Sequence, residues 1–165
     1  MQRFEYFTTE DGFKFLNFNN TYYLISYTGT DEVPTLPALV NGKTYKCQYM
    51  DSTLKNIKLS SDFTSIHDYM FRYCSHLESI EIPNSITSIG RYAFSNCTSL
   101  TNITTPSSVT SIGSWAFYGC YNLYEVINNS DLVFTPGSSS YGYIAYYALK
   151  VVNKGLASYK DNATF

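Results

Sequence analysis

The chain has 165 residues, a formal net charge of −2 and no long run of charges of one sign. Surfaces that bind nucleic acid or anionic membranes need clustered Lys and Arg, so the composition argues against both kinds of partner. No stretch approaches the roughly 20 apolar residues that span a bilayer, and the N-terminus MQRFEYFTTEDGF lacks the apolar segment of a signal peptide. We therefore expect no nucleic-acid partner and no membrane insertion.

The N-terminal part contains three aromatic-rich runs, at residues 3–7, 13–18 and 21–27. Asp11-Gly12 and Asn19-Asn20 separate these runs, and such dipeptides favour tight turns between antiparallel strands. A small β-meander can cover the open end of a stack of repeats. The sequence therefore predicts a β-type N-terminal cap over residues 1–36.

A 23-residue repeat dominates the middle of the chain. The same spacing separates the members of several columns, which are Phe71, Phe94 and Phe117; Cys74, Cys97 and Cys120; Ile66, Ile89 and Ile112; and Leu54, Leu77, Leu100 and Leu123. A unit of this length cannot bury its apolar side alone, so consecutive units must stack as coils of a solenoid. We predict four such coils over residues 37–128, the first of them degenerate.

Each coil divides into a strand and a return segment. The end of the unit, as in Leu77-x-x-Ile80-x-Ile82, places alternate apolar residues on one side of a short parallel strand. The A-F-x-x-C-x-x-L segment has apolar residues at i, i+1, i+4 and i+7, which favours a short helix or 3₁₀ turns. The predicted fold class is thus a leucine-rich repeat solenoid of α/β type, mostly short parallel strands with irregular helical returns.

The C-terminal part, residues 129–165, is predicted to be a cap and a tail. Five apolar residues lie on one face if this part forms a helix, namely Ile144, Ala145, Ala148, Leu149 and Val152. Gly155 is placed to end that helix. A helical C-terminal cap is therefore expected.

The cysteine and histidine residues give little sign of chemistry. Cys74, Cys97 and Cys120 are predicted to be buried free thiols, with disulfides or a metal site as weaker alternatives. Cys47 falls outside this column and aligns with Met70, Ala93 and Ala116. His67 and His76 have no matching catalytic partner and are predicted to be exposed. We predict no enzyme activity, no metal and no cofactor.

Two sets of side chains are candidates for contact with a partner. The first set points outward from the strands, on the side expected to be concave, where repeat proteins usually bind: Asn56, Lys58, Ser79, Glu81, Asn102, Thr104, Glu125 and Ile127. The second set is Tyr69, Tyr92 and Trp115, each just before a buried pair. An ordinary solvated strand face and a self-stacking aromatic ladder are the structural alternatives to partner binding.

Residues 84–106, NSITSIGRYAFSNCTSLTNITTP, and residues 107–129, SSVTSIGSWAFYGCYNLYEVINN, resemble the repeats of BspA-like leucine-rich repeat proteins, also called the Treponema pallidum type. The resemblance covers residues 60–128 closely and residues 37–59 loosely. It implies a surface or secreted microbial protein that adheres to a host-matrix or microbial protein or to a glycan.

These considerations predict a non-enzymatic binding or adhesion module at the cell surface or outside the cell. One alternative is a structural spacer without a ligand of its own. Another is the recognition domain of an intracellular or phage-borne protein. The oligomeric state is left open.

Overall fold

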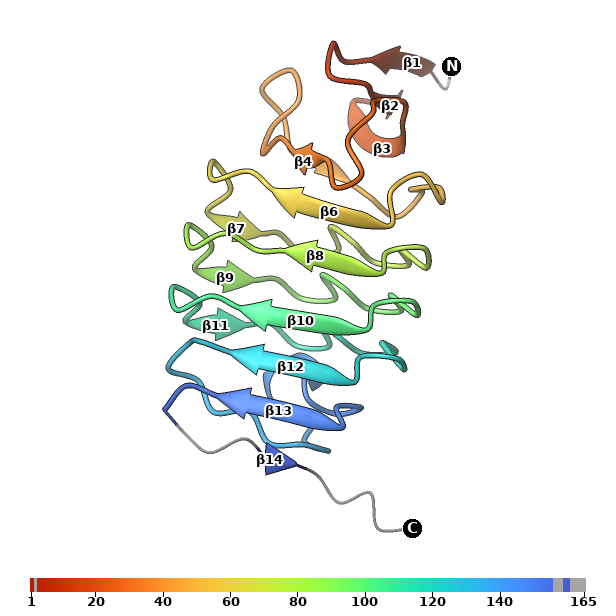
Figure 1. Cartoon of the computed structure of the whole chain (residues 1–165). Coiled ribbons are helices and arrows are strands. Elements are labelled where there is room, and N and C mark those ends of the chain that lie inside the picture. The colour runs from red at the N-terminus through yellow and green to blue at the C-terminus, as the bar shows by residue number, and fades with distance from the viewer. Residues whose placement is uncertain (2, 156–158, 161–165) are drawn as a thin grey trace.

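The computed structural model describes residues 1, 3–155 and 159–160, the last two by their backbone alone. It is a solenoid of stacked coils with an antiparallel sheet at its N-terminal end (Figure 1). The N-terminal sheet consists of β1 (Phe4–Thr8), β2 (Phe13–Phe18) and β3 (Thr21–Tyr27). The predicted meander is present, and Gly12, Asn19 and Asn20 have the positive φ that its turns require. Strand β3 continues into the solenoid by parallel pairing with β5 (Tyr45–Lys46).

Six strands stacked along one side of the molecule form its main strand face (Figure 1). They are β4 (Thr35–Leu36), β6 (Asn56–Leu59), β8 (Ser79–Glu81), β10 (Asn102–Thr105), β12 (Glu125–Asn128) and β13 (Lys150–Asn153). Parallel pairing joins β4, β6 and β8 in one group and β10, β12 and β13 in another. The amide of Thr101 donates to the carbonyl of Glu78 where the two groups meet.

The register between coils keeps the predicted spacing of the repeat, as in the pairs Ile57↔Ile80 and Ile103↔Val126. Alternate side chains of the strands therefore point into a common core. Within it the rings of Phe71, Phe94 and Phe117 stack with centroids 5.2 and 5.0 Å apart. The predicted leucine column of Leu54, Leu77, Leu100 and Leu123 is also buried.

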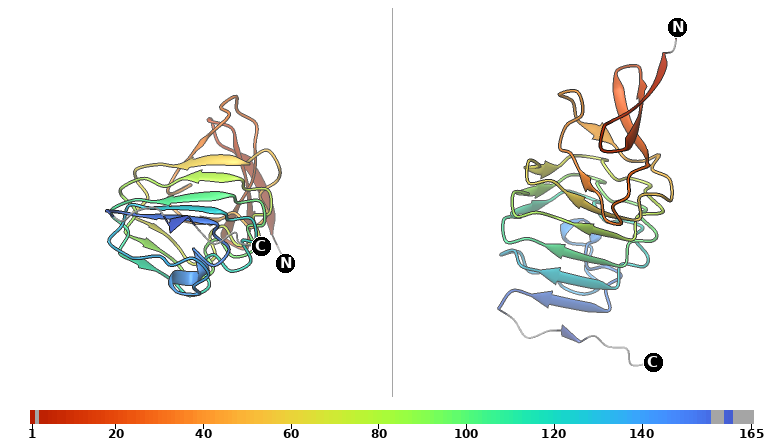
Figure 2. Two further views of the ribbon diagram at one scale, coloured as in Figure 1. Left: turned by 60° about the horizontal axis from the view of Figure 1, so that its bottom comes forward. Right: turned by 45° about the horizontal axis from the view of Figure 1, so that its top comes forward.

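A second, shorter sheet lies behind the first and consists of β7 (Ser65–Ile66), β9 (Ser88–Ile89) and β11 (Ser111–Ile112) (Figures 1 and 2). The repeat pattern alone predicts only one strand in each coil. The Ser-Ile pairs bond to one another as well, because three consecutive coils carry the same extended Thr-Ser-Ile segment at equivalent positions. Each of these three coils thus has two strand segments rather than one.

The predicted helical returns are wrong. Between the short sheet and the main strand face the chain makes consecutive turns, and residues such as Tyr69 and Tyr73 interrupt any helix with φ near +64°. Alternate amides of this segment donate to the following coil, as Tyr69 does to Arg91, Phe71 to Ala93 and Tyr73 to Ser95, at 2.7–3.0 Å. An α-helix would use these amides internally, so coil-to-coil bonding replaces helix formation.

The predicted helical C-terminal cap is also wrong. The only helical segment among the described residues is the short 3₁₀ turn η1 (Tyr141–Tyr143), and residues 150–153 form β13, which continues the main strand face. Ile144, Ala145 and Ala148 are buried as in earlier coils, whereas Leu149 is exposed and Val152 half-buried. Strand β14 (Tyr159–Lys160) pairs antiparallel with β13, and the rest of the predicted tail lies outside the described residues.

The solenoid therefore has one strand more on each side of the four predicted coils. The division into residues 1–36, 37–128 and 129–165 stays a prediction. Within the described residues, no helix has the length and apolar character needed to cross a bilayer.

Candidate functional site

Four aromatic side chains, Tyr69, Tyr92, Trp115 and Tyr143, form a column that we call the aromatic ridge. Neighbouring rings stack with centroids 5.3, 6.4 and 5.1 Å apart, and their planes differ by no more than 20°. The predicted alternative of a self-stacking ladder is thus present in the structure. Trp115 is 40% exposed, and the other three rings are half-buried.

The backbone sets the position of these rings. All four residues have φ between 54° and 70°, the left-handed region that bulky residues rarely adopt. This conformation turns each ring outward from the buried side chains that follow it, such as Phe71 and Phe94. The ridge therefore repeats because the coil geometry repeats.

Stacking decides what the aromatic ridge can offer a partner. Because the rings lie face to face along the solenoid axis, their inner faces cover one another and their edges turn toward solvent. Ring edges carry positive partial charge, and tyrosine hydroxyls and the indole N–H are hydrogen-bond donors. The ridge is thus suited to acceptor-rich groups and poorly suited to a sugar ring that must stack on an open aromatic face.

Two arginines lie beside the ridge and were not predicted as site residues. The guanidinium carbon of Arg72 lies 5.4 Å from the ring centroids of Tyr69 and Tyr92 and 4.6 Å from that of Tyr73. The guanidinium of Arg91 lies 5.9 Å from the Tyr92 ring. Among the described residues neither arginine forms a salt bridge. Their spacing on the repeat, one residue before Tyr92 and three after Tyr69, is the sequence signal that could have identified them.

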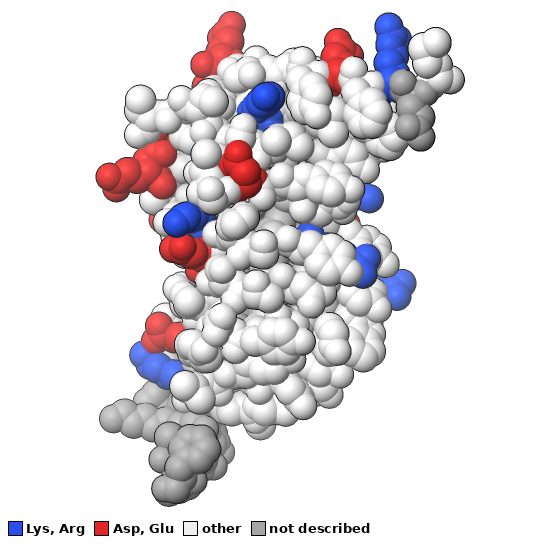
Figure 3. Space-filling model, turned by 90° about the vertical axis from the view of Figure 1, so that its right-hand side faces the viewer, with Lys and Arg blue, Asp and Glu red and all other residues white. Residues whose placement is uncertain are grey.

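The ridge widens toward the C-terminal end. Tyr118 packs edge-on against both Trp115 and Tyr143, and Tyr146 and Tyr147 continue the cluster. In the side view of Figure 3 a broad area of the lower half carries no charged side chain. Tyr143 was not predicted, because its separation from Trp115 along the chain is longer than the period of the repeat.

The predicted strand-face residues do form two outward columns. Pairing places Asn56 beside Ser79 and Asn102 beside Glu125 in one column, and Lys58 beside Glu81 and Thr104 beside Ile127 in the other. Several of these side chains satisfy one another, since the hydroxyl of Ser79 donates to Oδ1 of Asn56 and Lys58 Nζ lies 3.5 Å from Glu81 Oε2. Lys150, on the added strand β13, pairs with Glu125. These internal contacts leave the strand face fewer free groups than the ridge.

All four cysteines are buried free thiols. The thiols of Cys74, Cys97 and Cys120 donate to the carbonyls of Cys47, Phe71 and Phe94, respectively, at 2.9–3.1 Å. Burial raises the pKa of every one of these thiols, which disfavours the reactive thiolate. The cysteines therefore act as packed residues of the hydrophobic core and not as reactive thiols.

The predicted alignment of Cys47 with Met70 is wrong by one residue. Its amide donates to the Met70 carbonyl as that of Phe71 does to Ala93, and its carbonyl accepts a thiol as that of Phe71 does. Cys47 thus occupies the phenylalanine column. One extra residue between Cys47 and Leu54 hides this equivalence in the sequence.

Groups that would support catalysis are sparse in the described residues. No cluster of three or more His, Cys, Asp or Glu side chains is arranged to hold a metal ion there. His76 is exposed as predicted, whereas His67 is half-buried, which corrects its predicted exposure. The side chain of His67 occupies space that, at the equivalent position of the later coils, is filled by the neighbouring coil.

Comparison with known proteins agrees with this geometry. The sequence model of the BspA type leucine rich repeat region matches residues 43–148 with six copies. Among curated proteins no relative matches.

Solved structures with similarity to the chain include three bacterial leucine-rich repeat proteins. A leucine rich cell surface protein from Faecalibacterium prausnitzii has 21% identity and a TM-score of 0.45, with 77% of this chain and 55% of that chain covered. The T. pallidum leucine rich repeat protein has 22% identity and a TM-score of 0.47, over 92% and 79% of the two chains. A protein from Bacteroides ovatus has 22% identity and a TM-score of 0.46, over 76% and 40%.

The chain thus spans about half the length of the Faecalibacterium protein. The family match covers well over half of the present sequence. The chain belongs to the BspA-type leucine-rich repeat family.

Proposed function

We propose that the protein is a non-enzymatic binding module of a microbial surface or secreted protein, and that the aromatic ridge is its principal contact surface. Proteins with BspA-type repeats are usually surface or adhesion proteins, which supports this location and role. The observation that carries the proposal is the partly exposed row of Tyr and Trp rings with two arginines that have no salt bridge among the described residues.

Tyr, Trp and Arg are the residues most enriched at the energetic centres of protein interfaces. The ring faces of the ridge are covered by stacking, so a protein partner fits this surface better than a glycan that needs an open ring face. A stable interface buries roughly 800 Å² per partner, which requires more than four ring edges. The neighbouring tyrosines at the C-terminal end supply the additional area.

Binding to immobilised host-matrix proteins, microbial surface proteins and glycans tests the proposal. The double variant Trp115→Asn, Tyr118→Ser removes two exposed rings; Asn tolerates positive φ, and Ser95 holds the position equivalent to Tyr118. We expect its affinity for the partner to fall at least tenfold while its melting temperature stays within a few degrees of wild type. Tyr6→Ser, which removes an even more exposed ring from the N-terminal sheet, is the control and should bind as wild type.

The alternatives give different results in the same assay. A loss of binding with Asn102→Ala, Thr104→Ala and none with the ridge variant would place the contact on the strand face. Absence of binding to every immobilised protein and glycan would favour a spacer. Either outcome contradicts the ridge as the contact surface.

A further inference from the structure

The short sheet has an open edge at β7. The hydrogen bonds of the following coils show which groups along that edge would donate to a further strand. In the following coils Thr87 N–H donates to Thr64 C=O and Gly90 N–H to Ile66 C=O, at 3.0 and 2.8 Å. The next coil repeats both bonds, from Thr110 to Thr87 and from Gly113 to Ile89. The hydroxyls of Thr87 and Thr110 add a further bond to the same carbonyls of the preceding coil.

Thr64 and His67 hold the equivalent positions in the first of these coils. β7 ends the order of the short sheet, and within the described part of the chain no hydrogen bond is formed by Thr64 N–H, the Thr64 hydroxyl or His67 N–H. The side-chain Nε2 of His67 is buried and also has no partner there. Three donors that bind a neighbouring main chain in the two following coils are thus unused at this edge.

The preceding stretch of chain turns away from β7. The offset that places Cys47 in the phenylalanine column would place residues 40–43 beside residues 64–67, but Val40 and Lys43 instead bond to each other around a turn at Asn41 and Gly42. This hairpin leaves a cleft of about 500 Å³ lined by Leu39, Phe63, Thr64, Ser65 and His67, among others. The cleft lies where a strand of the preceding coil would otherwise pair with β7.

The missing neighbour also explains the histidine. A Cβ atom at Gly90 would lie 2.6 Å from Asp68 N and 2.8 Å from His67 C, because the preceding coil is in contact with it. Position 67 has no preceding coil directly against it, so a full side chain fits there. His67 therefore marks the point at which stacking of the short sheet stops.

We propose that this cleft binds an extended peptide segment of another protein, which adds to β7 as a parallel strand. Thr64 O and Ile66 O, the acceptors used by the next coil, are two residues apart. The bound segment must likewise present two carbonyls two residues apart, to Thr64 N–H and His67 N–H. Its residue at the second carbonyl occupies the place of Ile66, which is fully buried, and is therefore apolar.

The charged residues of the clefts determine which ligand residues are favoured next to this apolar residue. An adjoining cleft of about 600 Å³ shares Leu39, Thr44 and His67 with the first and carries Lys43 and Lys46, without any acidic residue in its lining. At the opposite end of the first cleft lies Asp62. A parallel segment runs from Asp62 toward the two lysines, so the favoured ligand has an acidic residue on the C-terminal side of its apolar anchor.

A peptide copied from the chain itself supplies a suitable probe. The sequence NSITSIG of residues 84–90 offers the carbonyls of Thr87 and Ile89, which serve Thr110 and Gly113 in the intact solenoid. We would add Asp-Glu to its C-terminus, acetylate and amidate its ends, and titrate it into ¹⁵N-labelled full chain. The controls are a scrambled peptide, a version with Asp in place of the second Ile, and a version ending in Lys-Lys.

We expect the probe to shift the amide resonances of Thr64 and His67 and to slow their hydrogen exchange, while the scrambled and Asp-substituted peptides do neither. Lys43→Glu, Lys46→Glu should weaken the acidic peptide about tenfold and reverse the preference toward the Lys-Lys version. The spectrum of each variant reports directly whether the fold is kept.

Unshifted Thr64 and His67 amides at millimolar probe would overturn the proposal. Shifts confined to the Trp115 indole would do the same, since they would assign the peptide to the aromatic ridge. The proposed function rests on the ridge alone, so either failure leaves it to be judged by its own assay.

Discussion

The backbones of neighbouring coils come close together where Gly90 and Gly113 lie on adjacent coils. A Cβ atom at Gly113 would fall 2.6 Å from Arg91 N and 2.8 Å from Gly90 C, both of which are main-chain atoms. Main-chain atoms of a hydrogen-bonded coil cannot move aside as a side-chain end can. The glycine is therefore required by the distance between coils.

Gly113→Ala should lower the free energy of unfolding by about 1–3 kcal/mol, the usual range for an overpacked site. Urea unfolding followed by circular dichroism measures the change. His67→Ala is the matched control, because it concerns the same column at the coil with no neighbour beneath it, and its effect should stay within about 0.5 kcal/mol. Equal stability of Gly113→Ala and wild type would contradict the close contact.

The buried thiols predict a stability that falls in alkaline solution. Burial raises the thiol pKa of Cys47, Cys74, Cys97 and Cys120 in the folded state, so above about pH 8.5 the unfolded chain loses protons that the folded chain keeps. Each thiol should then lower the free energy of unfolding by about 1.4 kcal/mol per pH unit, with no contribution at lower pH. Between about pH 8.5 and 9.5, below the ordinary tyrosine pKa of about 10, this slope is measurable by urea unfolding.

Removal of one thiol provides the check. Cys97→Ala should unfold more easily at every pH, yet its alkaline slope should be about a quarter smaller than that of wild type. A thiol reagent should likewise find no reactive cysteine in the folded chain and four after denaturation. An unchanged slope in the variant would show that other groups cause the pH dependence.

At the scale of elements, the sequence predicted the strands but not the return segments. The difference lies in where the backbone amides find their hydrogen-bond partners. The strands were predictable, because alternating apolar residues that recur at a constant spacing leave few other ways to bury them. The return segments were not, since A-F-x-x-C-x-x-L satisfies a helical pattern equally well. The competing factor is the bonding of amides such as Phe71 N–H to the next coil, together with positive φ at Tyr69 and Tyr73, neither of which has a signature in those residue types.

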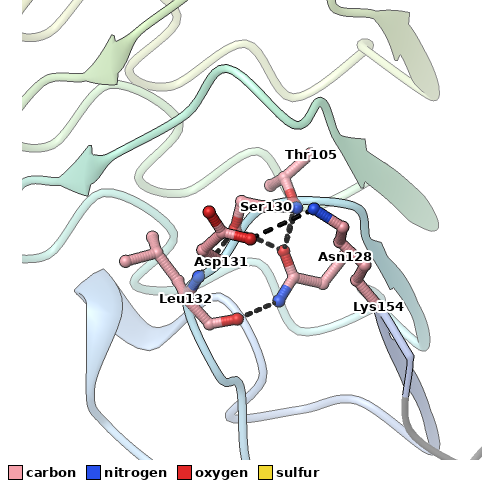
Figure 4. A network of polar contacts seen from close by, with 6 residues as sticks. All are labelled: Thr105, Asn128, Ser130, Asp131, Leu132 and Lys154. Carbon is pink, nitrogen blue, oxygen red and sulfur yellow. Dashed lines mark hydrogen bonds and ion pairs between the residues drawn. The ribbon is translucent and has the colours of Figure 1, made fainter.

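One core column changes from apolar to polar toward the C-terminal end. The column begins with Leu36 and Leu59, and strand pairing continues it from Thr105 to Asn128 and Asn153. Asn128 Oδ1 accepts from the hydroxyls of Thr105 and Ser130, at 2.9 and 2.6 Å, and its Nδ2 donates to the Leu132 carbonyl (Figure 4). The same Nδ2 also donates to Asn153 Oδ1. At the rim of this network Lys154 pairs with Asp131.

Asn128→Ala should destabilise the C-terminal coils, because it leaves the buried hydroxyls of Thr105 and Ser130 without their acceptor and Asn153 Oδ1 with one donor fewer. An unsatisfied buried group costs about 1–3 kcal/mol, which sets the expected loss in the free energy of unfolding. Asn122→Ala, which removes an exposed asparagine in the same coil, should have little effect. Hydrogen exchange would locate the loss in β10, β12 and β13, and an unchanged exchange rate there would contradict it.

At the scale of the whole molecule, the repeat predicted the stack but not its ends. Six strands follow one another instead of four, because β4 and β13 join the stack although their coils depart from the regular pattern of the repeat. The pairs Glu125↔Lys150 and Val126↔Val151 are farther apart in sequence than the paired residues of the regular coils, and so are Trp115 and Tyr143. Insertions of a few residues remove a column from the sequence pattern while leaving its three-dimensional position intact, and for this reason the ridge was predicted one ring too short.

The stack of Phe71, Phe94 and Phe117 joins three consecutive coils within the hydrophobic core. Each coil contacts only its neighbours, so a defect in the middle coil affects both halves of the solenoid. Phe94 is fully buried between the other two rings, with centroids 5.2 and 5.0 Å away. The effect of its removal should therefore exceed that of a ring at either end.

Phe94→Ala should lower the free energy of unfolding by about 3–5 kcal/mol, the usual cost of truncating a buried phenylalanine. Because the coils on both sides lose a neighbour, the single Trp115 and the far-ultraviolet circular dichroism should report the same shifted urea midpoint. Phe4→Ala, at an exposed ring stacked on Phe18 in the N-terminal sheet, is the matched control and should cost less than about 1 kcal/mol. If the Trp115 midpoint stayed unchanged while the dichroism shifted, the two halves of the solenoid would unfold independently, and Phe94 would not couple them.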